Sequence, residues 1–326
     1  MNVIKFGTLP NGDEVLQYTL KTEVAEVRIL NFGGIVTDFV YGNRNIVCGF
    51  ESIEDYLLDD SYQGALIGRF ANRIAGAAFP LNGRVYKIGA NEGSNSLHGG
   101  IVGFNRRIFE VKAATDTSLT LTRISPDGEE GYPGNLSVEV TYSLEDASLS
   151  IAYKATTDAD TPVSLTNHSY FNLAGVGTPV LDSLIMINAD RYTEVGEDLI
   201  PTGNRPLVAG TAYDLRAPRR IGEKANGYDT NFILNTIADE TAPALAATVE
   251  GGGLRLSVYT TQPCIQLYTG CVLEGEPAFR GGVKKARYTA FCLETQSEPN
   301  APNQGGSILR AGDTYSHTTI YRIEKA

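Results

Sequence analysis

The segment Leu136–Leu144 (LSVEVTYSL) and the segment Leu149–Ala155 (LSIAYKA) decide the fold class of this chain. In both segments apolar and polar residues alternate, which is the period of a β-strand that buries one of its faces. Only a short stretch of chain lies between them. The two segments are therefore expected to pair as an antiparallel hairpin.

Similar β-prone patterns extend from this hairpin toward both ends of the chain. The predicted strands are Glu14–Lys21, Glu23–Leu30, Ile35–Tyr41, Phe109–Ala114, Leu119–Ile124, Leu181–Tyr192, Leu254–Thr260, Cys264–Thr269, Arg287–Leu293 and Thr314–Ile323. Asn82-Gly83 between β-prone residues is the strongest short-range hairpin signal. Helical periodicity is scarce, and Ser52–Leu58, with Ser52 as N-cap and Asp55 three residues later, is one of the few helix candidates.

Many short strands joined by Gly and Pro turns are typical of a large antiparallel sandwich or barrel. No repeat stands out and no linker divides the chain. We therefore predict an all-β protein with a single domain over residues 1–326.

The composition limits the partners. The chain has 326 residues, a net charge of −11 and 42% hydrophobic residues. That hydrophobic share excludes a disordered chain. Nucleic acid and anionic membrane surfaces are bound by basic faces, so the negative charge argues against both partners. No apolar run approaches the roughly 18 residues of a membrane helix.

The cysteines and the start of the chain indicate the compartment. No Cys-x-x-Cys pair and no zinc-site spacing occurs among Cys48, Cys264, Cys271 and Cys292. The start, Met1–Gly7, has no apolar core long enough for a signal peptide. Buried, reduced thiols and a cytoplasmic location are expected.

Thr166–Leu173 (TNHSYFNL) is the first candidate for chemistry. It carries His168, one of only three histidines, at the end of a predicted strand. A histidine held there by a rigid scaffold can face a cleft, and near neutral pH it can donate or accept a proton. A lone histidine is more often a hydrogen-bonded structural residue, so the interpretation depends on other segments.

Further polar candidates occupy other strand ends and loops. They are Arg69, Asn72, His98, Asp229, Gln266 and Glu294. A histidine and a carboxylate brought into one cleft could act as a general acid–base pair. The third histidine, His317, has no second polar group of note beside it and is interpreted as structural.

Cofactor and metal chemistry have little support. The chain lacks a P-loop, a GxGxxG turn after a strand, a GxSxG elbow and a His-Glu-x-x-His motif. Two histidines with Asp and Glu could bind a metal, but no short ligand spacing occurs. No metal and no organic cofactor are expected.

Six motifs together carry a family resemblance. They are Gly68–Ile74, Asn95–Gly100, Asp127–Asn135, Thr166–Leu173, Gln266–Gly270 and Leu293–Gln296. In this order they resemble the aldose 1-epimerase (galactose mutarotase) family. The resemblance implies a large β-sandwich of the galactose mutarotase-like supersandwich type. It also implies an active site in an open cleft, a small sugar as substrate, and no metal or organic cofactor.

The resemblance also implies roles for individual residues. Glu294 is the expected general base that takes the proton of the C1 hydroxyl, and His168 the general acid that protonates the ring oxygen. His98 is expected near the ring oxygen or C1. The expected substrate-binding residues are Arg69, Asn72, Tyr170, Asp229 and Gln266. These roles predict a bell-shaped pH profile limited by Glu294 on the acid side and by His168 on the basic side.

Some features depart from the family pattern or leave alternatives open. Thr230 follows Asp229 where many members have His, and the charged stretch Glu274–Lys285 is not matched. The chain has no Trp, so a stacking platform must come from Tyr170, Tyr268 or Phe279. The alternatives are a non-catalytic carbohydrate-binding protein, a glycosidase with two carboxylates, and an epimerase for a different or phosphorylated sugar. A monomer or a homodimer is expected.

Overall fold

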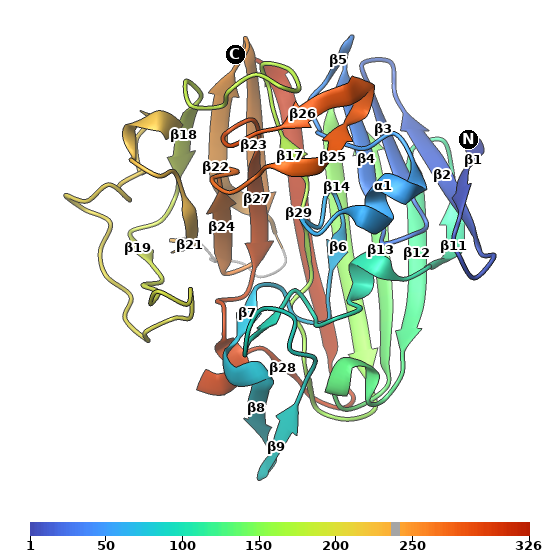
Figure 1. Cartoon of the computed structure of the whole chain (residues 1–326), viewed down its shortest axis with the longest axis vertical. Helices are drawn as coiled ribbons and strands as arrows, with labels where there is room; N and C mark the ends of the chain where they lie inside the picture. Colours follow the sequence, from blue (N-terminus) through green and yellow to red (C-terminus); the bar gives the residue numbers. More distant parts are fainter. Residues whose placement is uncertain (236–241) are drawn as a thin grey trace.

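A computed structural model describes residues 1–235 and 242–326 and confirms an all-β chain (Figure 1). Its largest sheet has nine antiparallel strands. In spatial order they are β11 (Glu110–Ala114), β12 (Ser118–Ser125), β13 (Leu136–Glu145), β14 (Ser148–Thr157), β29 (Thr314–Lys325), β23 (Leu254–Thr260), β22 (Ala244–Gly251), β18 (Leu184–Ile187) and β20 (Arg219–Arg220).

The predicted hairpin forms the third and fourth strands of this sheet. β13 and β14 pair from Leu136↔Thr157 to Glu145↔Ser148. Residues on β13 alternate between buried and more exposed positions along the whole strand, because one face of the sheet packs on the core. The register that the sequence pattern requires is therefore the register of the structure.

Two five-stranded sheets pack against the large sheet. The N-terminal one is ordered β1 (Asn2–Thr8), β2 (Glu14–Lys21), β3 (Ala25–Leu30), β4 (Val36–Tyr41) and β5 (Arg44–Asn45). The second is ordered β17 (Tyr170–Phe171), β27 (Phe291–Gln296), β24 (Cys264–Tyr268), β21 (Asp229–Ile233) and β19 (Arg191–Tyr192).

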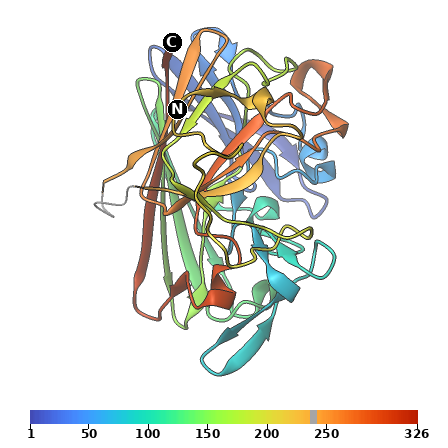
Figure 2. The ribbon, with the colours of Figure 1, turned by 90° about the vertical axis from the view of Figure 1, so that its left-hand side faces the viewer.

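One hydrophobic core joins the three sheets. It contains Phe39 of the N-terminal sheet, Val140 and Tyr321 of the large sheet, and Leu293 of the second five-stranded sheet, all at most 1% exposed. The hydroxyl of Tyr321 donates across the layers to the carbonyl oxygen of Leu293. The sheets remain open layers (Figure 2), so the fold is a sandwich and not a barrel.

Smaller elements connect the three large sheets. The two-stranded sheets are β7 (Arg73–Ile74) with β10 (Ser96–Leu97), β8 (Ala78–Leu81) with β9 (Arg84–Lys87), β15 (Thr161–Pro162) with β28 (Ile308–Leu309), β16 (Thr166–Asn167) with β6 (Leu66–Ile67), and β25 (Gly275–Phe279) with β26 (Val283–Lys285). The 3-10 turns are Ala75–Ala77, Phe104–Arg106, Glu129–Gly131, Ile221–Glu223, Arg280–Gly282 and Ala301–Gln304. β8 and β9 form the predicted hairpin, with φ above zero at both Asn82 and Gly83.

The short helix α1 (Ile53–Leu58) begins where the sequence predicts it. The hydroxyl of Ser52 accepts a hydrogen bond from the amide of Asp55, and the carboxylate of Asp55 accepts one from the amide of Ser52. This capping box satisfies donors that the first helical turn leaves unpaired. No helix in residues 1–235 or 242–326 is long and apolar enough to cross a membrane.

Some boundaries near the polar candidates differ from the sequence expectations. The expected strand Leu181–Tyr192 is two separate strands, β18 and β19. The sequence predicts a loop over Gly227–Phe232, but Asp229 begins strand β21. Glu294 lies inside β27 and not beyond the end of a strand. All residues of β27 are buried, so no alternation of polar and apolar residues marks where this strand starts or stops.

Candidate active site

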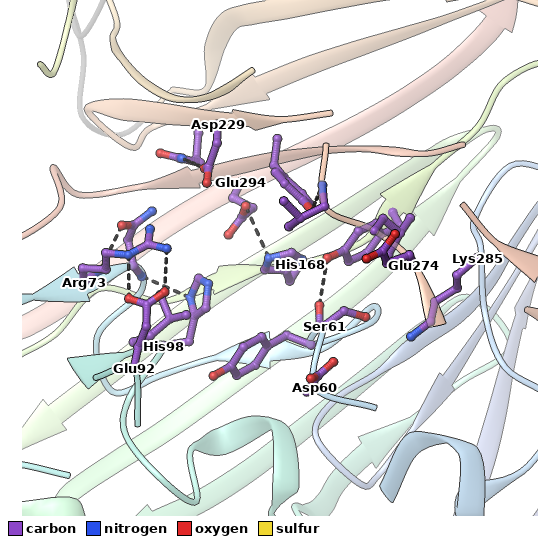
Figure 3. Close-up of a pocket in the computed structure, with 18 residues that line it drawn as sticks. Asp60, Ser61, Arg73, Glu92, His98, His168, Asp229, Glu274, Lys285 and Glu294 are labelled. Carbon is purple, nitrogen blue, oxygen red and sulfur yellow. Dashed lines mark hydrogen bonds and ion pairs between the residues drawn. The ribbon is translucent and has the colours of Figure 1, made fainter. Parts of the chain in front are cut away.

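A pocket of about 320 Å³ lies beside the second five-stranded sheet (Figure 3). Strands β27, β24 and β21 run side by side, with Gln266 opposite Glu294 and Asn231 opposite Gln266. This pairing brings Glu294, Gln266 and Asp229 to one wall. His168 lies between β16 and β17, where the chain turns from one small sheet to the next.

The pocket gathers nearly all of the predicted site residues. Those that line it are His168, Glu294, His98, Asn72, Tyr170, Asp229 and Gln266. The predicted residue that does not line it is Arg69. Segments that are far apart in the chain thus converge on one cavity, which is what a catalytic site on a β-scaffold requires.

The interpretation of Arg69 as a sugar-binding residue needs correction. Its guanidinium is buried and donates hydrogen bonds to two hydroxyl groups and to four backbone carbonyl oxygens. These acceptors belong to Ser125, Pro126, Pro133, Gly134 and Thr161. With its donors committed in this way, Arg69 joins the motif Gly68–Ile74 to the motif Asp127–Asn135 and is structural.

Arg73 is the arginine of the pocket, and the sequence reasoning did not select it. Its Nε and Nη2 atoms donate to the two carboxylate oxygens of Glu92, both at 2.7 Å. This bidentate geometry fixes the guanidinium plane at one end of the cavity. Both arginines flank Asn72 in the same short motif, so no sequence signal separates them.

His168 and Glu294 face each other in the middle of the pocket. The Nε2 atom of His168 is 3.5 Å from Oε1 of Glu294, and both side chains are buried. Burial disfavours charge on either group. It lowers the pKa of His168 to about 4 and raises the pKa of Glu294 well above its usual range, with Asp229 adding to the rise and Arg73 opposing it.

His98 is held as a neutral hydrogen-bond donor. Its Nδ1 atom accepts a hydrogen bond from the backbone amide of Asn72 at 3.1 Å, so Nε2 carries the ring proton. Burial lowers the pKa of His98 well below its usual value, and His168 and Arg73 lower it further. The two imidazole rings lie 5.2 Å apart between centroids.

Two residues that line the pocket carry buried polar atoms without a hydrogen-bond partner. Gln266 donates from Nε2 to Oδ1 of Asp229 at 2.6 Å, and burial raises the pKa of Asp229. Oε1 of Gln266 and Oε2 of Glu294 are buried and have no hydrogen-bond partner in residues 1–235 and 242–326. Leaving such atoms unpaired is costly, so hydroxyl groups of a bound molecule are suited to this position.

Comparison with known proteins identifies the family. The aldose 1-epimerase family model matches residues 16–322. The galactose mutarotase of Sus scrofa is 42% identical, over 97% of this chain and 96% of the relative. The aldose 1-epimerase of Escherichia coli strain K12 is 36% identical, over 86% of this chain and 85% of the relative.

The chain belongs to the aldose 1-epimerase family. Membership makes it an isomerase that interconverts the anomers of an aldose. The crystal structure of galactose 1-epimerase from Lactobacillus acidophilus NCFM has the same fold, with a TM-score of 0.88 and 27% identity, and the match covers 100% of this chain and 98% of that one.

The aromatic residues expected to stack on a sugar differ in their access to the pocket. Phe279 is 1% exposed and its ring packs at 6.2 Å on that of Phe50, so it is not available to a sugar. Tyr170 lines the pocket but stacks on His168 at 5.1 Å. Tyr268 also lines the pocket, as does Tyr62, which the sequence reasoning missed.

The fold also forms a cluster of potential metal ligands that the spacing did not predict. Ligand atoms of His98, His168 and Glu294 all lie within 4.8 Å of one another. A metal would need the lone pair of Nε2 on His98, which requires the proton on Nδ1. Nδ1 faces the amide donor of Asn72, so the cluster does not fit a metal ion.

Three residues of this aldose 1-epimerase site have left-handed backbone conformations. Tyr62, Asn72 and His98 line the pocket and have φ values of 58°, 65° and 52°. Residues other than glycine rarely adopt this left-handed conformation, and it persists only where surrounding contacts enforce it. The pocket is therefore shaped at the expense of local conformational energy.

Proposed function

We propose that this aldose 1-epimerase opens the sugar ring with Glu294 as base and His168 as acid. Glu294 takes the proton of the C1 hydroxyl, its O–H electron pair forms the C1 carbonyl, and the bond from C1 to the ring oxygen breaks. His168 gives its proton to the ring oxygen. Rotation about the C1–C2 bond and the reverse transfers close the ring on the other face. The observation that carries this proposal is the 3.5 Å approach of the two groups in the pocket.

The protonation of the pair suits a reversible reaction. At pH values between the lowered pKa of His168 and the raised pKa of Glu294, the two groups together hold one proton. Burial, which raises the pKa of Glu294 and lowers that of His168, favours Glu294 as the carrier of that proton before substrate binds. A sugar hydroxyl that donates to the unpaired Oε2 of Glu294 favours the carboxylate, and the shared proton moves to Nε2 of His168, which gives the base and the acid that the opening step needs.

The substrate we propose is a neutral hexose, galactose or glucose. The two cations that line the pocket are already paired, Arg73 with Glu92 and Lys285 with Asp59. Among the residues that the structure describes, no further lysine or arginine lines this pocket to receive a phosphate group. The choice of galactose rests on the galactose mutarotases named among the relatives.

Polarimetry on freshly dissolved α-D-galactose and α-D-glucose tests the reaction. We expect the approach to the equilibrium rotation to be much faster than in buffer alone, with glucose 6-phosphate a poor substrate. NMR of the product should show inversion at C1 alone. Rates equal to buffer would favour a carbohydrate-binding protein, and release of a reducing sugar from a glycoside would favour a glycosidase.

We also propose that residues 1–326 form one domain. Support comes from β29, near the C-terminus, which lies between β14 and β23 inside the large sheet. Limited proteolysis tests this proposal, because two domains would yield two stable fragments.

A further inference from the structure

A buried ion pair lies at the end of the pocket opposite Arg73. Nζ of Lys285, the last residue of β26, is 3.2 Å from Oδ1 of Asp59, and both side chains are at most 2% exposed. The Lys285 ammonium also lies 5.5 Å from the centroid of the Phe50 ring. This pair ties the hairpin β25–β26, within the charged stretch that the family pattern left unmatched, to the chain after α1.

Asp59 organises the loop that follows it. Its Oδ1 atom accepts from the hydroxyl of Ser61, and its Oδ2 atom accepts from the amide of Gln63. Arg106 donates to the carbonyl oxygen of Asp59, and the hydroxyl of Tyr170 donates to the carbonyl oxygen of Ser61. The carboxylate therefore links Lys285 to both sides of residue 62.

Tyr62 is the residue that this loop presents to the histidines. Its ring centroid is 4.7 Å from that of His98 and 6.1 Å from that of His168. Its φ of 58° is one that tyrosine adopts only under constraint. The contacts of Asp59 hold the backbone on both sides of Tyr62, while the Tyr62 hydroxyl accepts a hydrogen bond from Asn91 at 3.1 Å.

We propose that Lys285 and Asp59 are positioning residues that clamp Tyr62 over His98 and His168. The inference rests on the proposed roles of the acid–base pair and deepens them. Removing Lys285 leaves the Asp59 carboxylate buried and unpaired, which is strongly unfavourable. The loop then rearranges to hydrate it, and Tyr62 moves off the imidazoles.

Water entry at His168 gives the clamp a distinctive signature. The titratable groups that face this imidazole are Tyr62, His98, Tyr170, Cys292 and Glu294. Of these, only Tyr62 belongs to the clamped loop. When Tyr62 moves, desolvation weakens and His168 titrates at a higher pH.

The test compares K285M with K284M, because Lys284 is the exposed neighbour of Lys285. For K285M we expect kcat to fall about tenfold or more, KM to change much less, and the NMR titration of His168 to move up by at least about half a pH unit. K284M should match the wild type. The double variant D59N/K285M leaves no unpaired charge and should recover part of kcat.

Several outcomes overturn the clamp. One is a K285M protein that melts earlier but keeps the wild-type kcat and His168 titration, because the pair then serves stability alone. If K285M does not fold, Y62A keeps the ion pair and must still reproduce the shift in His168 titration; an unchanged titration rejects the proposal. The titration needs no turnover. If the wild-type protein shows no mutarotation but K285M still shifts the His168 titration, the proposed function is rejected and the clamp is not.

Discussion

Nε2 of His168 and Oε1 of Glu294 lie 3.5 Å apart, although the two residues come from segments with no sequence relation to each other. His168 lies between β16 and β17, and Glu294 projects from the middle of β27. β17 pairs with β27, so the sheet itself sets their separation. A rigid sheet is a suitable support for proton transfer, which tolerates little displacement.

Glu294→Gln and His168→Ala should each lower kcat by about 10² to 10⁴, since positioned acids and bases contribute that much. KM should change much less. His317→Ala is the matched control, because His317 lies on β29 outside the pocket. Polarimetry on a fresh anomer measures all three, and near wild-type turnover in either pocket variant would contradict the assigned roles.

The pH profile of kcat/KM should be bell-shaped, with His168 limiting the acid side and Glu294 the basic side. This order is the reverse of the sequence expectation. Burial places the pKa of His168, about 4, below that of Glu294. As the pH falls through the lower value, both groups are protonated and no base remains. As the pH rises through the raised pKa of Glu294, the pair has no proton to donate. Glu294→Gln should therefore remove the basic limb from the residual activity, and loss of the acid limb would contradict this order.

Glu294→Gln should also stabilise the protein, increasingly so as the pH rises. The pKa of Glu294 is higher in the folded chain than in the unfolded chain. Between these two values the unfolded state binds fewer protons, so stability falls with rising pH. Glutamine carries no such penalty. Thermal melts of the variant and the wild type at pH 5 and pH 8 should show a gain in Tm that is larger at pH 8. Each kcal/mol of added unfolding free energy raises Tm by about 2–4 °C or less. A gain independent of pH would count against burial as the cause.

Arg69→Met and Arg73→Met should have different effects. Loss of Arg69 leaves several buried carbonyl oxygens without donors, so we expect a loss of at least about 3 kcal/mol in unfolding free energy. Loss of Arg73 should mainly raise KM, because Arg73 lines the pocket. Denaturant melts and steady-state kinetics separate the two, and a stable Arg69 variant with a raised KM would restore Arg69 as a sugar ligand.

Activity should survive dialysis against a chelator, and added Zn²⁺ should not increase it. The reason is the hydrogen bond from the Asn72 amide to Nδ1 of His98, which leaves Nε2 protonated. Metal analysis of the purified protein provides the control. Activity that is lost on chelation and returns with one divalent ion would show that the His98 ring adopts the other tautomer.

The elements that the sequence predicts well are those with one buried face. β13 and β14 alternate along their length, the capping box at Ser52 uses residues three apart, and the Asn82-Gly83 turn requires φ above zero at both positions. Each signal acts between residues that are close in the chain. Local sequence therefore determines these elements and, together with the motifs, the family.

Only the tertiary structure decided which polar side chains share the pocket. Arg69 and Arg73 look alike in sequence, yet carbonyl oxygens of a distant loop bind one and the cavity receives the other. The pairing of Lys285 with Asp59 and the order of the His168 and Glu294 pKa values depend on burial by segments far away in the chain. Contacts and desolvation of this kind arise from packing, and no periodicity or spacing in the sequence records them.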